Sequence, residues 1–273
     1  KILATAENPA MQVVISNTTE VGLQYQQEDL TKSGSPVSFP GKLTAWLKHR
    51  FDKGLNGLVI VPTELVVDNG ILLKSFVLKH AHHNQMGEDF IQWLNEKNNF
   101  CNSLVDRIVP GKPSNDELKK IEDSVGYNDS LLLKCEAYKL WAIEGDENVR
   151  DVLSFEQADK NIIIAKDITQ YRELKLRILN ATHTLMSGLA FLSRFEHVKD
   201  ALNDEMMEKF MTILMLTEMA PSLPSNIDAK LALNGLLSDP NLDGDLRVYE
   251  GGTLLEYTNT IYTSRDEKVK MNN

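Results

Sequence analysis

Three polar side chains lie close together in one stretch of the sequence, Lys175-Leu-Arg-Ile-Leu-Asn180-Ala-Thr-His183. In an α-helix His183 lies about 80° round the axis from Lys175, and Asn180 lies about 60° further, within an axial length of about 12 Å. A lysine near apolar residues can shuttle a proton, an amide can donate to a carbonyl or alkoxide oxygen, and an imidazole can fix a hydroxyl. The spacing therefore predicts three groups that converge on one small polar group.

The same stretch also fits an ordinary helix, with Leu174, Ile178 and Leu179 facing inward and Lys175 in solvent. Spacing alone favours this ordinary helix, because lysine is usually exposed. Asn180 and His183 are harder to explain in this way, since they are flanked by apolar residues and buried polar groups need partners.

The elements around this stretch are predicted from the pattern of apolar residues. Residues 166–219 are rich in Leu and Met and are expected to be almost entirely helical. Upstream, apolar runs alternate with helical patterns, which predicts a parallel sheet covered by helices. The expected strands are 11–16, 57–61, 103–109, 131–133, 138–143 and 162–164. The expected helices start at Pro40, occupy 70–98 in two pieces, and run from a capping box at Ser114 and Glu117 to Gly126.

These patterns divide the chain into three parts. Residues 1–165 are predicted to form an α/β domain, and residues 166–225 the start of a helical domain. Residues 226–273 are a tail that fits neither, and its two β-rich runs around Gly251-Gly252 are typical of a hairpin.

Asn17, Thr18, Thr19 and Glu20 follow the first expected strand. Open α/β sheets bind their ligands outside the carboxyl ends of the strands. We therefore expect these residues in a cofactor-binding region, although a plain strand-to-loop turn explains the same residue types equally well.

Composition excludes some classes of function. The 273 residues carry a formal charge of -10, which argues against a nucleic-acid partner, and no basic run for nucleic acid or anionic lipid is present. No apolar run approaches the length that spans a membrane, and no signal peptide is visible. Cys101 and Cys135 fit neither CxxC nor zinc spacing, so both are expected to be buried thiols in a cytoplasmic protein.

Three further features have ordinary explanations that we prefer. His80, His82 and His83 are not expected to bind a metal, because His82 and His83 point to different sides of a helix. The methionines of the helical region are expected to fill the core rather than to line a groove. They are Met206, Met207, Met211, Met215 and Met219. Arg107 fits either a substrate carboxylate or a structural ion pair near Asp106.

Five segments in the expected order resemble the polyol-specific long-chain dehydrogenases, the mannitol dehydrogenase family. Lys175, Asn180 and His183 match the family's K-x4-N-x2-H signature. The other four segments are VISNTTEVG at 14–22, FPGK at 39–42, FCNSLVDRIVP at 100–110 and LWAIEG at 140–145. The resemblance covers roughly residues 1–225 and is strong because several segments agree.

The resemblance implies an NAD-dependent oxidoreductase with a Rossmann-like nucleotide-binding domain and a mostly α-helical second domain. It makes Lys175 the general acid in ketone reduction and the base in alcohol oxidation. Asn180 and Asn102 would hold the developing oxyanion, and His183 would position substrate hydroxyls. Hydride would pass directly between the nicotinamide and the substrate, without a metal. The substrate would be a small sugar acid or polyol. The sequence motifs SNTTE and NATHTLM favour the family members that interconvert tagaturonate and altronate in hexuronate breakdown.

The sequence also departs from this family. None of its 15 glycines forms a GxGxxG phosphate loop, so the Rossmann-like domain is expected to be incomplete at its N-terminus. Only the start of the helical domain is expected within these residues. Two alternatives stay open. One is a family member that acts on mannitol or fructuronate, and the other is a non-catalytic α/β module that serves in an interaction.

Overall fold

The computed structural model describes most of the first 227 residues. The described residues are 2–19, 21–27, 30, 34–107, 109, 111–135, 139–196, 200–201, 203–224 and 227. They form two compact units, each described below by itself. The first comprises 1–105 with 140–168, and the second comprises 106–139 with the chain from 169 onward.

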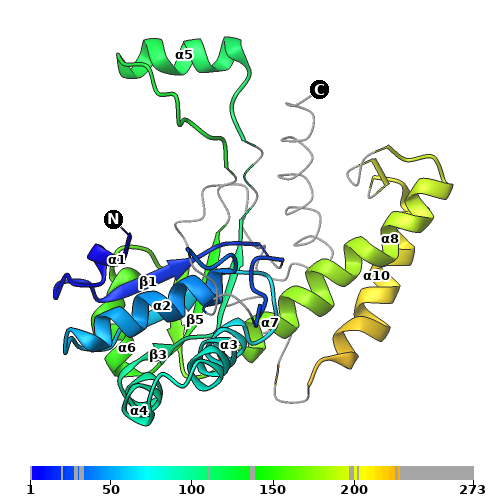
Figure 1. Cartoon of the computed structure of the whole chain (residues 1–273). Coiled ribbons are helices and arrows are strands. Elements are labelled where there is room, and N and C mark those ends of the chain that lie inside the picture. The colour runs from blue at the N-terminus through cyan, green and yellow to red at the C-terminus, as the bar shows by residue number, and fades with distance from the viewer. Residues whose placement is uncertain are drawn as a thin grey trace. The chain divides into compact units, whose positions relative to one another are not determined.

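The first unit is built on parallel strands (Figure 1). The strands are β1 (Val13–Ser16), β2 (Val59–Pro62), β3 (Asn99–Phe100), β4 (Ser103–Asp106), β5 (Leu140–Glu144) and β6 (Ile162–Ala165). β1 pairs with β2 and β2 with β3, while β4, β5 and β6 are neighbours in that order. The Cys101 N–H donates to Ile60 O and the Asn102 carbonyl accepts from Glu144 N–H, so the segment 99–106 joins both sets of strands.

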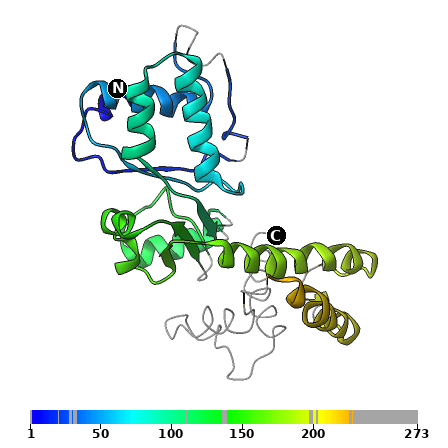
Figure 2. The ribbon, with the colours of Figure 1, turned by 90° about the horizontal axis from the view of Figure 1, so that it is seen from below.

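Helices cover both faces of these strands because neighbouring strand residues point to opposite sides. Ile60 of β2 packs in a core with α2 (Phe39–Asp52), α3 (Asn69–His83) and α4 (Glu88–Lys97). Val59 and Val61, its neighbours in the strand, pack in a second core with α6 (Glu147–Leu153). The blue and cyan helices of the first core form one layer in Figure 2.

A buried arginine fixes the beginning of this unit. Arg50 of α2 donates to four backbone carbonyls, at distances from 2.7 to 3.1 Å. The acceptors belong to Ala6, Asn8, Met11 and Asn56. The guanidinium thereby ties α1 (Ile2–Thr5) and the entry to β1 onto α2. Burial lowers the pKa of Arg50, but a guanidinium keeps its charge at any physiological pH.

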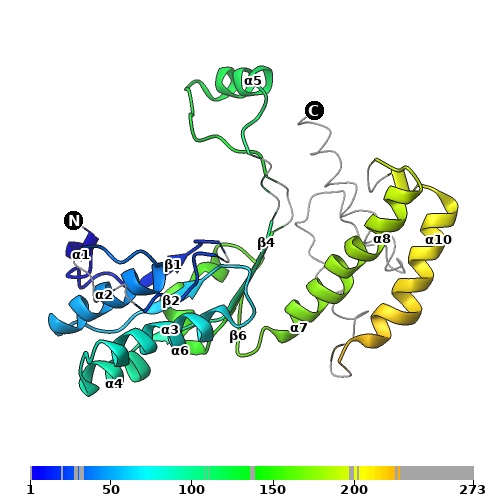
Figure 3. The same ribbon diagram turned by 45° about the vertical axis from the view of Figure 1, so that its right-hand side comes forward.

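The second unit includes an extension that carries α5 (Asn115–Val125) at the end of two extended segments (Figure 3). The Ser114 hydroxyl accepts from Glu117 N–H and the Glu117 carboxylate accepts from Ser114 N–H, which is the predicted capping box. Gly126 ends the helix with φ of 80°, a conformation that favours glycine. An isolated antiparallel bridge joins Gly111 and Lys134 at the base of the extension.

The helical part of this unit is a pair of neighbouring helical rods (Figures 1 and 3). The first rod runs through α7 (Thr169–Glu173), the π-helix η2 (Leu174–Asn180) and α8 (Ala181–Leu192). The second runs through α10 (Glu205–Leu214), the π-helix η3 (Met215–Met219) and the short η4 (Ala220–Ser222). Buried side chains between them form two apolar clusters, one around Met186 and Met211 and one around Ile178 and Met215.

The predicted α/β character, the two helices within 70–98 and the limits of α5 are confirmed. Four predictions are wrong in detail. Residues 131–133 do not form a strand, and Leu131 and Leu133 are exposed there. Cys135 is exposed rather than buried. Met206 lies in solvent, whereas the other four methionines of its group are buried. Residues 174–180 are a π-helix and not an α-helix. The hairpin expected near Gly251 lies outside the described residues.

Candidate active site

Lys175 and Asn180 share one π-helical turn. The N–H of Ala181 donates to the carbonyl of Leu176, five residues earlier, as the π pattern requires. A turn closed by i→i+5 bonds holds more residues than an α turn, so residues five apart lie closer round the axis than the roughly 140° of an α-helix. The K-x4-N spacing therefore matches the period of this turn, and its two polar side chains are brought toward the same face.

The Lys175 side chain is largely buried, with 11% of its surface exposed, and Asp106 is its acidic neighbour. Lys175 Nζ lies 3.7 Å from Asp106 Oδ1, and the Asp106 side chain is 12% exposed. A surface lysine would keep its ammonium hydrated. The ordinary-helix prediction for Lys175 is therefore wrong on the point of exposure.

Apolar packing holds the π turn from the other side. Leu174 and Ile178 are buried in a cluster with Met215 and Met219, the first and last residues of the second π-helix. The Thr182 hydroxyl is buried and donates to the Ile178 carbonyl at 2.5 Å. Leu174 and Ile178 thus pack the turn against the second rod, while Lys175 is not a member of this cluster.

The structure says less about Asn180 and His183, the other two residues of the signature. The Asn180 side chain is exposed, so it is accessible to a small molecule. His183 belongs to α8, and its side chain lies outside the described residues. Lys175, Asn180 and His183 thus follow one another along a single rod, and their convergence on one group stays a prediction.

Asn102 lies in the first unit and links two elements there. Its Oδ1 accepts from the N–H groups of Gly70 and Ile71 at 3.0 and 3.1 Å, which caps the start of α3. Its Nδ2 donates to Glu144 Oε1 at 3.3 Å. The amide is 6% exposed. The role of Asn102 as an oxyanion donor stays a prediction, and these contacts would hold its amide in a fixed orientation for it.

The predicted cofactor residues follow β1, as expected for the carboxyl end of a strand. Asn17 and Thr19 are exposed, Thr19 has a positive φ of 70°, and Glu20 lies outside the described residues. Thr18 is held by a buried carboxylate, because Glu64 accepts from the Thr18 N–H at 2.9 Å and from its hydroxyl at 2.8 Å. The loop after β1 is therefore attached to the end of β2.

Glu64 and Asn69 were not singled out from the sequence. Glu64 is 2% exposed and also accepts from the Ser16 hydroxyl at 3.1 Å. Asn69 Nδ2 donates to three carbonyls, those of Pro62, Glu64 and Ser103. Both follow the apolar strand 59–62, so a search for polar residues at the carboxyl ends of every predicted strand would have found them.

Cys101 is buried between β3 and β4, whereas Cys135 is exposed. Burial raises the pKa of the Cys101 thiol to about 12, with smaller contributions from the Asp146 and Glu144 carboxylates. The Cys101 thiol is therefore protonated and unreactive at neutral pH.

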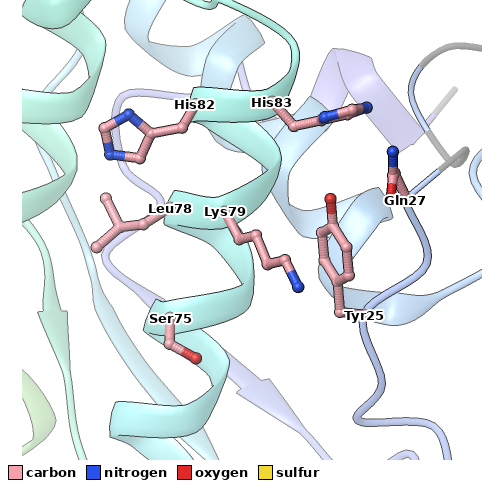
Figure 4. Close-up of a pocket in the computed structure, with 7 residues that line it drawn as sticks. All are labelled: Tyr25, Gln27, Ser75, Leu78, Lys79, His82 and His83. Atoms are coloured by element: carbon pink, nitrogen blue, oxygen red, sulfur yellow. The ribbon is translucent and has the colours of Figure 1, made fainter.

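Among the described residues no group of three His, Cys, Asp or Glu side chains is arranged to hold a metal ion. His82 and His83 instead line a shallow pocket of about 570 Å³ with Tyr25 and Lys79 (Figure 4). The two imidazoles point to different sides of α3, as their spacing predicted. The pocket lies along the later turns of α3 and contains none of the predicted site residues.

A dinucleotide site needs a strand order that reverses, which opens a crevice at the carboxyl ends. Within each of the two three-stranded groups the described strands follow chain order, β1-β2-β3 and β4-β5-β6, so neither group contains such a reversal. The described residues also contain no glycine-rich loop that leads into a helix. Asn17 and Thr19 are exposed after β1, and the cofactor role expected for these residues stays a prediction.

Comparison with known proteins identifies the family. Residues 1–157 match the mannitol dehydrogenase Rossmann domain, and residues 167–232 match the mannitol dehydrogenase C-terminal domain. The chain belongs to the mannitol dehydrogenase family. The resemblance of the five sequence segments and the expected Rossmann-like fold are thereby confirmed.

Several relatives within the mannitol dehydrogenase family are altronate oxidoreductases. The chain is 42% identical to that of Halalkalibacterium halodurans over 225 residues, which are 81% of this chain and 43% of the relative. It is 41% identical to the Bacillus subtilis protein, over 82% of this chain and 47% of that relative. A relative from Escherichia coli is 38% identical, with the same coverage. The chain thus spans slightly less than half the length of these relatives.

Solved structures agree on the fold. A substrate-free D-sorbitol dehydrogenase superposes with a TM-score of 0.70 at 21% identity, over 96% of this chain and 52% of that one. Pseudomonas fluorescens mannitol 2-dehydrogenase, in a complex with NAD and D-mannitol, superposes with a TM-score of 0.63 at 19% identity, over 100% of this chain and 58% of that one. Among the described residues, no helix is both long and apolar enough to cross a membrane.

Proposed function

We propose that the protein is an NAD-dependent oxidoreductase that interconverts tagaturonate and altronate, as a step in hexuronate breakdown. The observation that carries the proposal is the buried Lys175, held beside Asp106 on the π turn that matches the K-x4-N signature. The similarity to altronate oxidoreductases supports the choice of substrate.

Lys175 is the proton-transfer group of this proposal. In carbonyl reduction its ammonium gives a proton to the substrate oxygen, and NADH, when bound, would supply the hydride that the carbonyl carbon needs to become the alcohol. In oxidation the neutral amine accepts the hydroxyl proton. The exposed Asn180 amide donates to the oxygen as its charge develops, and His183 holds a substrate hydroxyl. The amides and the ammonium supply the polarisation, so no metal takes part.

Asn102 is the second oxyanion donor of the proposal. One N–H of its Nδ2 donates to Glu144, and the second N–H of this amide is the proposed donor to the substrate oxygen. The Gly70 and Ile71 N–H groups fix its orientation, so its donor can be aimed without a loss of side-chain entropy on binding.

A substrate panel tests the proposal. The full-length protein is assayed for NADH oxidation with tagaturonate, fructuronate and fructose, and for NAD reduction with altronate and mannitol. We expect kcat/KM for tagaturonate to exceed that for each other carbonyl by at least tenfold. Turnover of mannitol and fructose without turnover of altronate and tagaturonate would contradict the proposal.

A non-catalytic interaction module is the second candidate, because the described residues lack a glycine-rich phosphate loop. Titration of the full-length protein with NADH, followed by the blue shift of nicotinamide fluorescence, separates the two candidates. We expect saturable binding in the micromolar range. Absence of binding up to millimolar NADH would favour the interaction module.

A further inference from the structure

We propose that Asp106 is the positioning residue of Lys175 and holds its side chain as an ammonium, ready to donate a proton. The inference rests on the proposed role of Lys175 as general acid. It adds a carboxylate to the site, because Asp106 is not part of the K-x4-N-x2-H signature.

Burial makes a counter-charge necessary. The side chains of Lys175 and Asp106 expose only 11% and 12% of their surfaces. Removing an ammonium from water disfavours its charged form, and an opposite charge nearby restores it. A carboxylate 3.7 Å from Nζ provides that charge.

The two residues come from separate elements, so the contact also fixes a position. Asp106 is the last residue of β4 and has a short side chain, whereas Lys175 reaches along a flexible stem from the π turn. The separation of 3.7 Å exceeds the roughly 2.7–2.9 Å of a charge-assisted hydrogen bond. Asp106 therefore attracts the ammonium by charge and limits where the flexible stem places it.

The other charged groups near the turn are arranged differently. On the same rod the Glu173 carboxylate pairs with Arg177 at 2.5 Å. Arg172 of α7 adds a positive charge, and Glu218 of the neighbouring π-helix η3 is exposed. Of the carboxylates on these described elements, Asp106 is the one whose contact with Lys175 is within ion-pair distance.

The test is the pH dependence of carbonyl reduction by Asp106→Asn in the full-length protein. Reduction requires the ammonium, so its rate falls as pH rises past the point where Lys175 loses its proton. Removing the carboxylate disfavours the ammonium. We expect the high-pH limb of kcat/KM to move to lower pH by about one unit. Asp106→Glu, which keeps the charge, is expected to stay within about 0.3 unit of wild type.

Matched controls distinguish a specific effect of Asp106 on Lys175 from a general effect of the substitution on folding. Glu218→Gln removes an exposed carboxylate from the helical rods and is expected to leave the pH limb unchanged. If Asp106→Asn does not fold, the smaller neutral Asp106→Ser replaces it. A neutral variant with reduced turnover but an unmoved limb would overturn the proposal. Should Lys175→Ala retain turnover, the general-acid role itself would be wrong, which is a separate result.

Discussion

Lys175 and Asn180 are one π-helical turn apart, with the Leu176 carbonyl between them accepting from Ala181, five residues further on. Helical turns of this kind occur mostly as short interruptions of α-helices and frequently at functional sites. Here the interruption coincides with the two residues whose spacing first suggested proton-transfer chemistry. The π turn is therefore part of the proposed site.

Insertion of one residue into this turn tests its role. Inserting one alanine after Leu176, which is exposed, places Lys175 and Asn180 six residues apart, about 120° from each other round an α-helix, and should therefore rotate Lys175 away from Asn180. We expect kcat to fall by at least about 100-fold, as misplacement by about 1 Å can cost. The matched control, Leu176→Ala, keeps the length of the segment and should retain most of the activity. An insertion variant that folds and turns over at the control's rate would contradict this role.

Arg50→Met tests the anchoring of the first unit. The substitution leaves four buried or part-buried carbonyls without their guanidinium donor. We expect the free energy of unfolding to fall by about 2–4 kcal/mol in urea titrations. Lys53→Met removes a neighbouring exposed cation and is expected to change stability little. Equal effects of the two substitutions would show that Arg50 is not an anchor.

The two described thiols should react at very different rates. Burial raises the pKa of Cys101 to about 12, whereas Cys135 is exposed. At pH 8 we expect iodoacetamide to label Cys135 and to leave Cys101 almost unmodified, as measured by peptide mass mapping. In urea the Cys101 thiol should become accessible and react. Equal labelling of both cysteines in the folded protein would be incompatible with a buried Cys101.

The capping box of α5 should have an acid-dependent stability. A hydrogen bond from Lys134, at 3.0 Å, and those from Ser114 lower the pKa of Glu117 to about 2. The folded-state pKa of Glu117 lies below the ordinary 4.5. The Glu117 carboxylate therefore contributes fully to the stability of α5 above pH 4.5, and this contribution is lost as pH falls toward 2. Carbon-13 NMR of the Glu117 carboxyl should give a midpoint near 2.

Lys134→Met serves as the comparison for that titration, because it removes the first cause of the shift. The Glu117 midpoint should then rise toward 4.5. A wild-type midpoint already near 4.5 would mean that the Lys134 contact does not persist in solution.

Much of the fold follows from local pattern. The strands around Ile60 and Ile163 are short apolar runs, and Ser114, Glu117 and Gly126 mark both ends of α5 by local hydrogen bonding. These signals need no knowledge of distant residues. These local signals were sufficient to predict a parallel sheet covered by helices, and to predict that the chain becomes mostly helical after residue 165.

The remaining features depend on contacts between distant parts of the chain. The π turn at Lys175 has the composition of an α-helix, and packing against Met215 and Met219 accompanies its altered period. The partnership of Asp106 with Lys175 joins residues 69 positions apart (175 minus 106), which no local pattern predicts. Cys135 resembles a buried thiol in sequence, but it lies on the extension that carries α5.

The central claim is that Lys175 transfers the proton. Its most direct test is the steady-state rate of tagaturonate reduction by Lys175→Ala, beside Lys209→Ala, which removes an exposed lysine from α10 of the same unit. General acid catalysis contributes about 100- to 10,000-fold. We expect a loss of that size for Lys175→Ala, with NADH affinity unchanged, and wild-type turnover for Lys209→Ala. Near-wild-type turnover by a folded Lys175→Ala variant would contradict the claim.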